Sequence, residues 1–198
     1  CIRDSANGDA AAEMLIDAVD AAAPQHDHRT VMIHAQTVRE DQLTRMKTLH
    51  MITSYFSTHT FYWGDWHRDS VLGEERGQRI SPMASTRQRG MVFTVHNDAP
   101  VVPPDMIRLL WASTNRQTRS GRILGPEQRL SIYDALRAMT INAAYQHFEE
   151  HEKGTIEVGK QADLVVLSRN PLAMSPADLL ELRIIATYAH GQHIFGRL

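Results

Sequence analysis

The sequence has little of several features that would indicate particular classes of protein. Cys1 is the single cysteine among 198 residues, so no disulfide can form within the chain, and the cellular compartment is left open. No apolar run approaches the about 18 residues of a membrane-spanning helix, and no signal peptide stands at the start. The net charge of −2, with both signs interspersed, argues against a nucleic-acid partner. An apolar share of 42% is sufficient for a core, so we expect a globular fold.

Histidine is plentiful, with 11 residues, and several of them follow apolar runs. The run Met91–Val95 has the β-branched and aromatic character of a buried strand, and it stops at His96 and Asp98. The run Thr30–Ala35 likewise ends near His34. One such histidine is more often a hydrogen-bonded core residue than a ligand. Two strands that end in His and His-x-Asp instead favour a metal site built from neighbouring strand ends.

The first part of the chain predicts a βαβαβ unit with parallel strands and helices outside. Asp9 is a plausible N-cap of a helix that stops at Pro24. Thr37 and Glu40 form a T-x-x-E capping box before a second helix, and Met51–Phe56 reads as the next strand. Because the strands are apolar throughout, we expect an α/β fold with His34 and Asp98 on the same rim of the sheet.

Further helices are predicted after residue 80 by the same kinds of terminal signal. Ser81 and Ser131 are predicted as the N-caps of two of them, and a third is predicted from Met106 to Thr114. Asp98 has an alternative role here as the N-cap of a following helix, although nearby prolines delay any helix start.

The segment Ser57–Ile80 has no clean periodicity and is long for a connection in a compact domain. It is rich in aromatic residues and histidines, among them His59, Trp63 and His67. We interpret it as a functional loop at the rim.

The composition changes after Gly154, where the string GTIEVGKQADLVVLS predicts a turn, a hairpin and a strand at Leu164–Leu167. Two further strand-like runs, Ile184–Tyr188 and His193–Phe195, flank a turn at residues 190–192. These are antiparallel signals. We therefore expect two parts, residues 1–150 and residues 151–198.

Five strings in this order carry a family resemblance: SANGDAA, RTVMIHA, the Trp-rich segment ending in LGEER, FTVHNDAP, and GTIEVGKQADLVVLS. Together they resemble the C-terminal half of a metal-dependent amidohydrolase. More narrowly, the chain is similar to the amidohydrolase-3 group, which includes N-substituted formamide deformylases. The resemblance covers nearly the whole chain, and its last string is the most specific.

The resemblance implies the C-terminal part of a (β/α)₈ TIM-type barrel, from roughly the fifth strand onward, with a small appended β-sandwich element. It also implies a divalent metal, expected to be zinc, with His34 and Asp98 as ligands contributed by the sixth and eighth strands. The family's fifth-strand motif reads His-Ala-x-Gly-Asp, whereas this chain has Ser5 in place of the histidine. Serine is a poor zinc ligand.

The residues at these strand ends suit hydrolysis of an amide. A zinc ion with an open position lowers the pKa of bound water to about 7 and polarises a carbonyl. We predict that Asp98 is catalytic, taking a proton from the water and returning it to the leaving nitrogen. His96 is expected to contact a metal ligand and hold it in place, or to contact substrate. Substrate contact is also predicted for His59, Trp63 and His67, although packing is an equal alternative for the two histidines.

The sequence therefore predicts a hydrolase of non-peptide C–N bonds whose substrate is a small N-acyl or N-formyl amine. The alternative is a catalytically inactive binding or assembly module whose metal site is broken at Ser5. Because Cys1 leads at once into a strand-like run without an initiator Met, we expect the chain to begin inside a longer protein. Alone it should self-associate through open sheet edges, or require its N-terminal half, and retain metal only partially.

Overall fold

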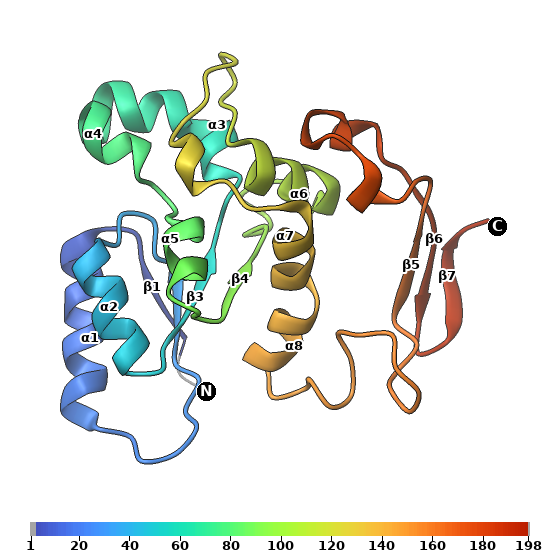
Figure 1. Cartoon of the computed structure of the whole chain (residues 1–198), viewed down its shortest axis with the longest axis horizontal. Helices are drawn as coiled ribbons and strands as arrows, with labels where there is room; N and C mark the ends of the chain where they lie inside the picture. Colours follow the sequence, from blue (N-terminus) through green and yellow to red (C-terminus); the bar gives the residue numbers. More distant parts are fainter. Residues whose placement is uncertain (1–2, 198) are drawn as a thin grey trace.

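The computed structural model describes residues 3–197, which form two β-sheets and the helices around them (Figure 1). The larger sheet has four parallel strands that neighbour one another in chain order. They are β1 Arg3–Ala6, β2 Val31–His34, β3 Ile52–Tyr55 and β4 Phe93–Val95. The prediction of parallel strands is confirmed, and the carboxyl ends of all four strands therefore lie at one edge of this sheet.

Helices pack against this sheet and supply much of the core. In Figure 1, α1 and α2 lie side by side next to the strands, while α7 and α8 lie between the parallel sheet and the smaller sheet. The helices are α1 Asp9–Ala22, α2 Glu40–Thr48, α5 Met83–Gln88, α6 Met106–Asn115, α7 Ile132–Met139 and α8 Ile141–Gln146, with a 3₁₀ turn η2 at Pro126–Gln128. Buried side chains from both layers form one cluster that includes Ile16, Met32, Leu43, Tyr55, Phe93, Leu109 and Ala135.

The helix starts follow the sequence signals only in part. Ser131 caps α7 as predicted, because its hydroxyl accepts a hydrogen bond from the backbone N–H of Asp134. The other cap predictions are wrong. Gly8, not Asp9, is the N-cap of α1, and Pro82, not Ser81, is the N-cap of α5.

The predicted capping box of α2 is displaced by two residues. The N-cap is Arg39, whose backbone N–H donates to the side chain of Gln42. Thr37 instead donates its hydroxyl hydrogen to the carbonyl of Asn7, 2.8 Å away, in the loop that follows β1. Thr37 therefore makes a long-range hydrogen bond instead of the local capping bond that the T-x-x-E pattern predicts.

The segment Ser57–Ile80 is mostly helical, so its prediction as a loop is wrong. It contains α3 His59–Trp66, a π-helix η1 at His67–Leu72, and α4 Gly73–Gln78. A Cβ atom on Gly64 would lie 2.9 Å from a methyl carbon of Thr118, so a larger residue at position 64 would push α3 away from the loop after α6, which contains Thr118. Because this segment is contacted from several sides, it has no single apolar stripe that a periodicity test could detect.

The C-terminal part contains a three-stranded antiparallel sheet, β5 Leu164–Leu167, β6 Ile184–Ala189 and β7 Gln192–Gly196. Two 3₁₀ segments, η3 Pro171–Ala173 and η4 Pro176–Glu181, connect β5 to β6. The predicted strands are confirmed, but the hairpin expected before Leu164 is absent, because residues 154–163 form turns and irregular backbone. Within the described residues, no helix is both long enough and apolar enough to cross a membrane.

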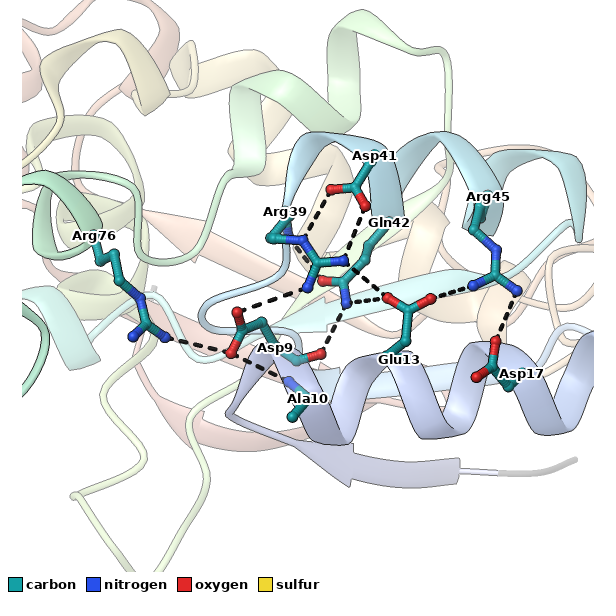
Figure 2. Close-up of polar contacts among 9 residues, drawn as sticks. All are labelled: Asp9, Ala10, Glu13, Asp17, Arg39, Asp41, Gln42, Arg45 and Arg76. Atoms are coloured by element: carbon teal, nitrogen blue, oxygen red, sulfur yellow. Dashed lines mark hydrogen bonds and ion pairs between the residues drawn. The ribbon is translucent and has the colours of Figure 1, made fainter.

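A network of charged side chains joins α1 to α2 at their exposed faces (Figure 2). Glu13 accepts hydrogen bonds from Arg39, Gln42 and Arg45, and the bond from Gln42 is the main cause that lowers the pKa of Glu13. Gln42 also donates to the backbone carbonyl of Asp9, 2.8 Å away. Exposed ion pairs contribute little individually, but together these join α1 to α2.

Candidate metal centre

The carboxyl edge of the parallel sheet carries a group of three polar side chains. His34 is the last residue of β2, while His96 and Asp98 follow β4 directly. The backbone N–H of His96 donates to the carbonyl of Tyr55, 2.9 Å away, which continues the pairing of β4 with β3 and fixes the direction of the His96 side chain. The chain then turns at Asp98.

The backbone at this edge is conformationally unusual. His34 has a φ of 71° and Asp98 a φ of 56°, both in the left-handed region that residues with a side chain seldom occupy. Such conformations cost energy and concentrate at functional sites. Asp98 caps no helix, because α6 begins after Asp105, whose carboxylate accepts from the N–H of Arg108. The alternative interpretation of Asp98 as an N-cap is therefore wrong.

The three side chains converge. His34 Nε2 lies 3.4 Å from Asp98 Oδ2, so the predicted proximity of these two residues is confirmed. One nitrogen from each histidine and one carboxylate oxygen of Asp98 all lie within 4.8 Å of one another, and each residue is half-buried. Sequence reasoning had placed His96 beside this group rather than within it.

A serine hydroxyl lies within hydrogen-bond distance of one nitrogen of each imidazole. His34 Nδ1 lies 2.8 Å from the Ser5 hydroxyl on β1, and His96 Nδ1 lies 2.9 Å from the Ser54 hydroxyl on β3. His96 Nε2 is buried with no hydrogen-bond partner among the described residues. Burial is the main cause that lowers the pKa of His96 to about 4, so this ring is neutral at pH 7.

This donor set fits a divalent transition metal. Neutral imidazole nitrogen and carboxylate oxygen are common zinc ligands, and catalytic zinc usually has three protein ligands with a fourth position open. Ligand atoms bound tetrahedrally at about 2.1 Å lie roughly 3.4 Å apart, which matches the 3.4 Å between His34 Nε2 and Asp98 Oδ2. The unpartnered nitrogen of His96 would gain the partner that a buried polar atom requires.

An aromatic cluster borders the three side chains. The ring of His59 stacks on that of His34 at 5.9 Å with an interplanar angle of 11°, and it meets the rings of Trp63 and His67 edge-on, each at 5.5 Å. Burial is the main cause that lowers the pKa of His59 to about 3. The predicted substrate-contact residues His59, Trp63, His67 and His96 thus lie around one position, next to His34.

Sequence reasoning missed two residues of this region. Phe56 lies between the histidines, with its ring 4.3 Å from that of His59 and 5.7 Å from that of His96. Ser54 was overlooked because it lies within β3, where all four residues are buried. Buried polar residues within a strand, here Thr53 and Ser54, are the signal that could have identified it.

The chain is similar to known proteins along nearly its whole length. The model of the amidohydrolase family matches residues 5–195. The N-substituted formamide deformylase of Arthrobacter pascens is 29% identical over 93% of this chain and 34% of its own length. Protein LONG AFTER FAR-RED 3 of Arabidopsis thaliana is 30% identical over 95% of this chain and 33% of its own length.

Among solved structures, an uncharacterized metal-dependent hydrolase from Pyrococcus horikoshii matches with a TM-score of 0.76 at 26% identity. The match covers 88% of this chain and 35% of that protein. The chain therefore spans about a third of the length of the relatives that it matches.

Proposed function

Because this chain belongs to the amidohydrolase family, we propose that it contributes the metal-holding C-terminal part of a hydrolase that acts on a non-peptide C–N bond. The proposed substrate is a small N-acyl or N-formyl amine. The observation that carries the proposal is the convergence of His34, His96 and Asp98 at the carboxyl edge of a parallel sheet. This is the edge at which α/β enzymes place their chemistry.

The proposal includes a (β/α)₈ barrel of which β1 to β4 form one half. Their parallel order, with helices packed outside, is the arrangement that a barrel repeats. Within the described residues, β1 and β4 are each paired on one side only. The relatives are about three times as long, which would allow further strands to close the sheet. Residues 151–198 would belong to a small β-sandwich beside the barrel.

His34, His96 and Asp98 would hold a divalent ion, which we propose to be zinc. When bound, such an ion makes water available as a nucleophile near pH 7 and polarises the amide carbonyl. Asp98 orients the attacking water, accepts its proton on a carboxylate oxygen and returns that proton to the leaving nitrogen.

The aromatic cluster would form the wall of the substrate pocket. Since the pKa values of His59 and His67 are lowered by burial, both rings are neutral at pH 7 and offer hydrogen bonds without charge. Both ring nitrogens of His67 are buried without a partner among the described residues. A wall of this kind favours an uncharged substrate portion, such as an aromatic or aliphatic N-substituent, packed against Trp63.

The test combines metal binding with turnover. The purified chain, and the longer protein wherever its gene encodes residues upstream, are loaded with Zn²⁺, desalted and assayed with a panel of N-formyl and N-acyl amines. We expect one site that His34→Ala removes and His26→Ala leaves intact, since His26 is exposed and precedes β2, whereas His34 is at the carboxyl end of that strand. We expect turnover in the longer protein that Asp98→Asn abolishes.

Two results would contradict the proposal. Zinc retention that is equal in wild type and His34→Ala would mean that this group holds no ion. Tight zinc binding that depends on His34, with no turnover of any amide by the longer protein, would favour the alternative function, a non-catalytic binding or assembly module.

A further inference from the structure

Resting on the proposed function, we infer that Ser5 and Ser54 are positioning residues that aim the two histidines of the metal centre. Each serine hydroxyl bonds the Nδ1 atom of one imidazole, at 2.8 Å for His34 and 2.9 Å for His96. With both Nδ1 atoms held, the Nε2 atoms are left available for an ion: His34 Nε2 lies 3.4 Å from Asp98 Oδ2, and His96 Nε2 has no hydrogen-bond partner among the described residues. The serines would touch neither metal nor substrate, and they act only through the histidines.

Ser54 has the more confined position of the two. It lies in β3, is 5% exposed, and pairs in register with Thr94 of β4, two residues before His96. His96 Nε2 is buried and unpartnered in the described part of the chain. Without the Ser54 hydroxyl, His96 Nδ1 would also lose its partner, and the ring could rotate away from the group.

Ser5 holds the position at which the family resemblance expects a histidine ligand. Its hydroxyl is bonded to His34, so this side chain supports a neighbouring ligand rather than acting as one. β1 and β2 pair in parallel with Ser5 opposite Ile33, which brings Ser5 next to the end of β2. The loop after β1 is fixed by Thr37 and Gln42, which bond the backbone carbonyls of Asn7 and Asp9.

A hydroxyl suits this role because it can either donate or accept a hydrogen bond. When Nε2 binds an ion, Nδ1 carries the ring proton and donates it to the serine oxygen. When His34 Nε2 instead donates to Asp98 Oδ2, 3.4 Å away, Nδ1 accepts from the serine hydroxyl. The same pair of side chains therefore keeps the ring orientation with and without metal.

The experiment measures Zn²⁺ affinity of the purified chain by competition with a fluorescent chelator. The variants are Ser5→Ala, Ser54→Ala and the hydroxyl-retaining Ser5→Thr and Ser54→Thr. Ser57→Ala is the matched control, because Ser57 is a buried serine whose hydroxyl bonds that of Ser113, 2.8 Å away, and no other side chain in the described part of the chain. We expect affinity to fall about 10- to 100-fold in Ser54→Ala, less in the exposed Ser5→Ala, and within about threefold in both threonine variants.

A second readout is ¹⁵N-histidine NMR of the zinc-loaded chain at pH 8. Wild type should show protonated Nδ1 on His34 and His96 in slow exchange with water, and each alanine variant should lose this signal for its own histidine. Because Ser5 is exposed, Ser5→Ala keeps the test decisive if Ser54→Ala unfolds.

The failures of the inference and of the proposed function are distinguishable. Zinc affinity and Nδ1 signals that are unchanged in both alanine variants would overturn the inference and leave the metal centre intact. Alanine variants that weaken zinc binding in a longer protein that hydrolyses no amide would support the inference and refute the proposed function. Wild type that binds no zinc at His34 would overturn both.

Discussion

Arg116→Met should destabilise the fold strongly, although Arg116 touches none of the candidate ligands. The Arg116 guanidinium is fully buried and donates to three backbone carbonyls, those of Leu124 at 2.6 Å, Ile80 at 2.6 Å and Ser81 at 3.1 Å. It thereby fastens the chain between α4 and α5 to the loop after α6. Burial is the main cause that lowers the pKa of Arg116 to about 10, so it remains protonated at pH 7.

The magnitude follows from opposing effects. Hydrogen bonds from a charged donor contribute about 1.5–3 kcal/mol each, so the loss of three such bonds would cost roughly 4–9 kcal/mol. Removing a buried charge recovers several kcal/mol of desolvation energy, and methionine keeps much of the apolar volume. We expect a net loss of about 2–4 kcal/mol in the free energy of unfolding, which for a chain of this size lowers Tm by roughly 10 °C.

The assay is urea unfolding followed by far-UV circular dichroism, with Arg119→Met as the control. Arg119 is exposed in the same loop, and its guanidinium lies 5.2 Å from the ring centroid of Tyr62. The control should change stability by less than about 1 kcal/mol. An Arg116→Met variant as stable as this control would refute the claim that the buried guanidinium fastens the two segments.

Three other predictions concern the site, the pH dependence and the sheet edges. In an active longer protein, Trp63→Ala should raise KM about tenfold with little change in Tm, since Trp63 is half-buried against His59. Equal losses of stability and activity at unchanged KM would mean that the Trp63 ring only stabilises the fold. The hydrogen bond from Arg29 is the main cause that lowers the pKa of Glu150 to about 2, so the ionised carboxylate stabilises the fold above pH 4.5 and loses this contribution as the pH falls toward 2. Glu150→Gln should therefore flatten the dependence of the free energy of unfolding on pH between these values. An unchanged slope in Glu150→Gln would contradict this prediction. Because β1 and β4 are unpaired at their outer edges in the described residues, the purified chain should sediment as a dimer or larger species, and a monodisperse monomer in analytical ultracentrifugation would contradict this.

The parts of the fold that could be predicted from the sequence are those with a strong local signal. The apolar runs ending at His34 and Asp98 predicted both the strands and their shared edge, because side chains that follow parallel strands meet at one rim. The tail was predictable for the same reason, since the run Leu164–Leu167 is a clear strand signal.

The remaining features depend on contacts between distant residues. Thr37 bonds the backbone of Asn7 instead of capping α2. The helices between residues 57 and 80 lack a single apolar stripe, and Gly64 packs tightly against Thr118, far along the chain. The inclusion of His96 in the ligand group depends on Ser54 of the neighbouring strand, and no pattern within FTVHNDAP reveals that hydrogen bond.

The central claim is that His34, His96 and Asp98 together hold one divalent ion. A crystal structure of the zinc-loaded protein, with anomalous data on both sides of the zinc edge, tests it most directly. We predict one anomalous peak about 2.0–2.2 Å from His34 Nε2, His96 Nε2 and a carboxylate oxygen of Asp98, with Ser5 and Ser54 still bonded to the Nδ1 atoms. A zinc peak elsewhere, or one bound by His34 and Asp98 while His96 Nε2 points away, would contradict the account.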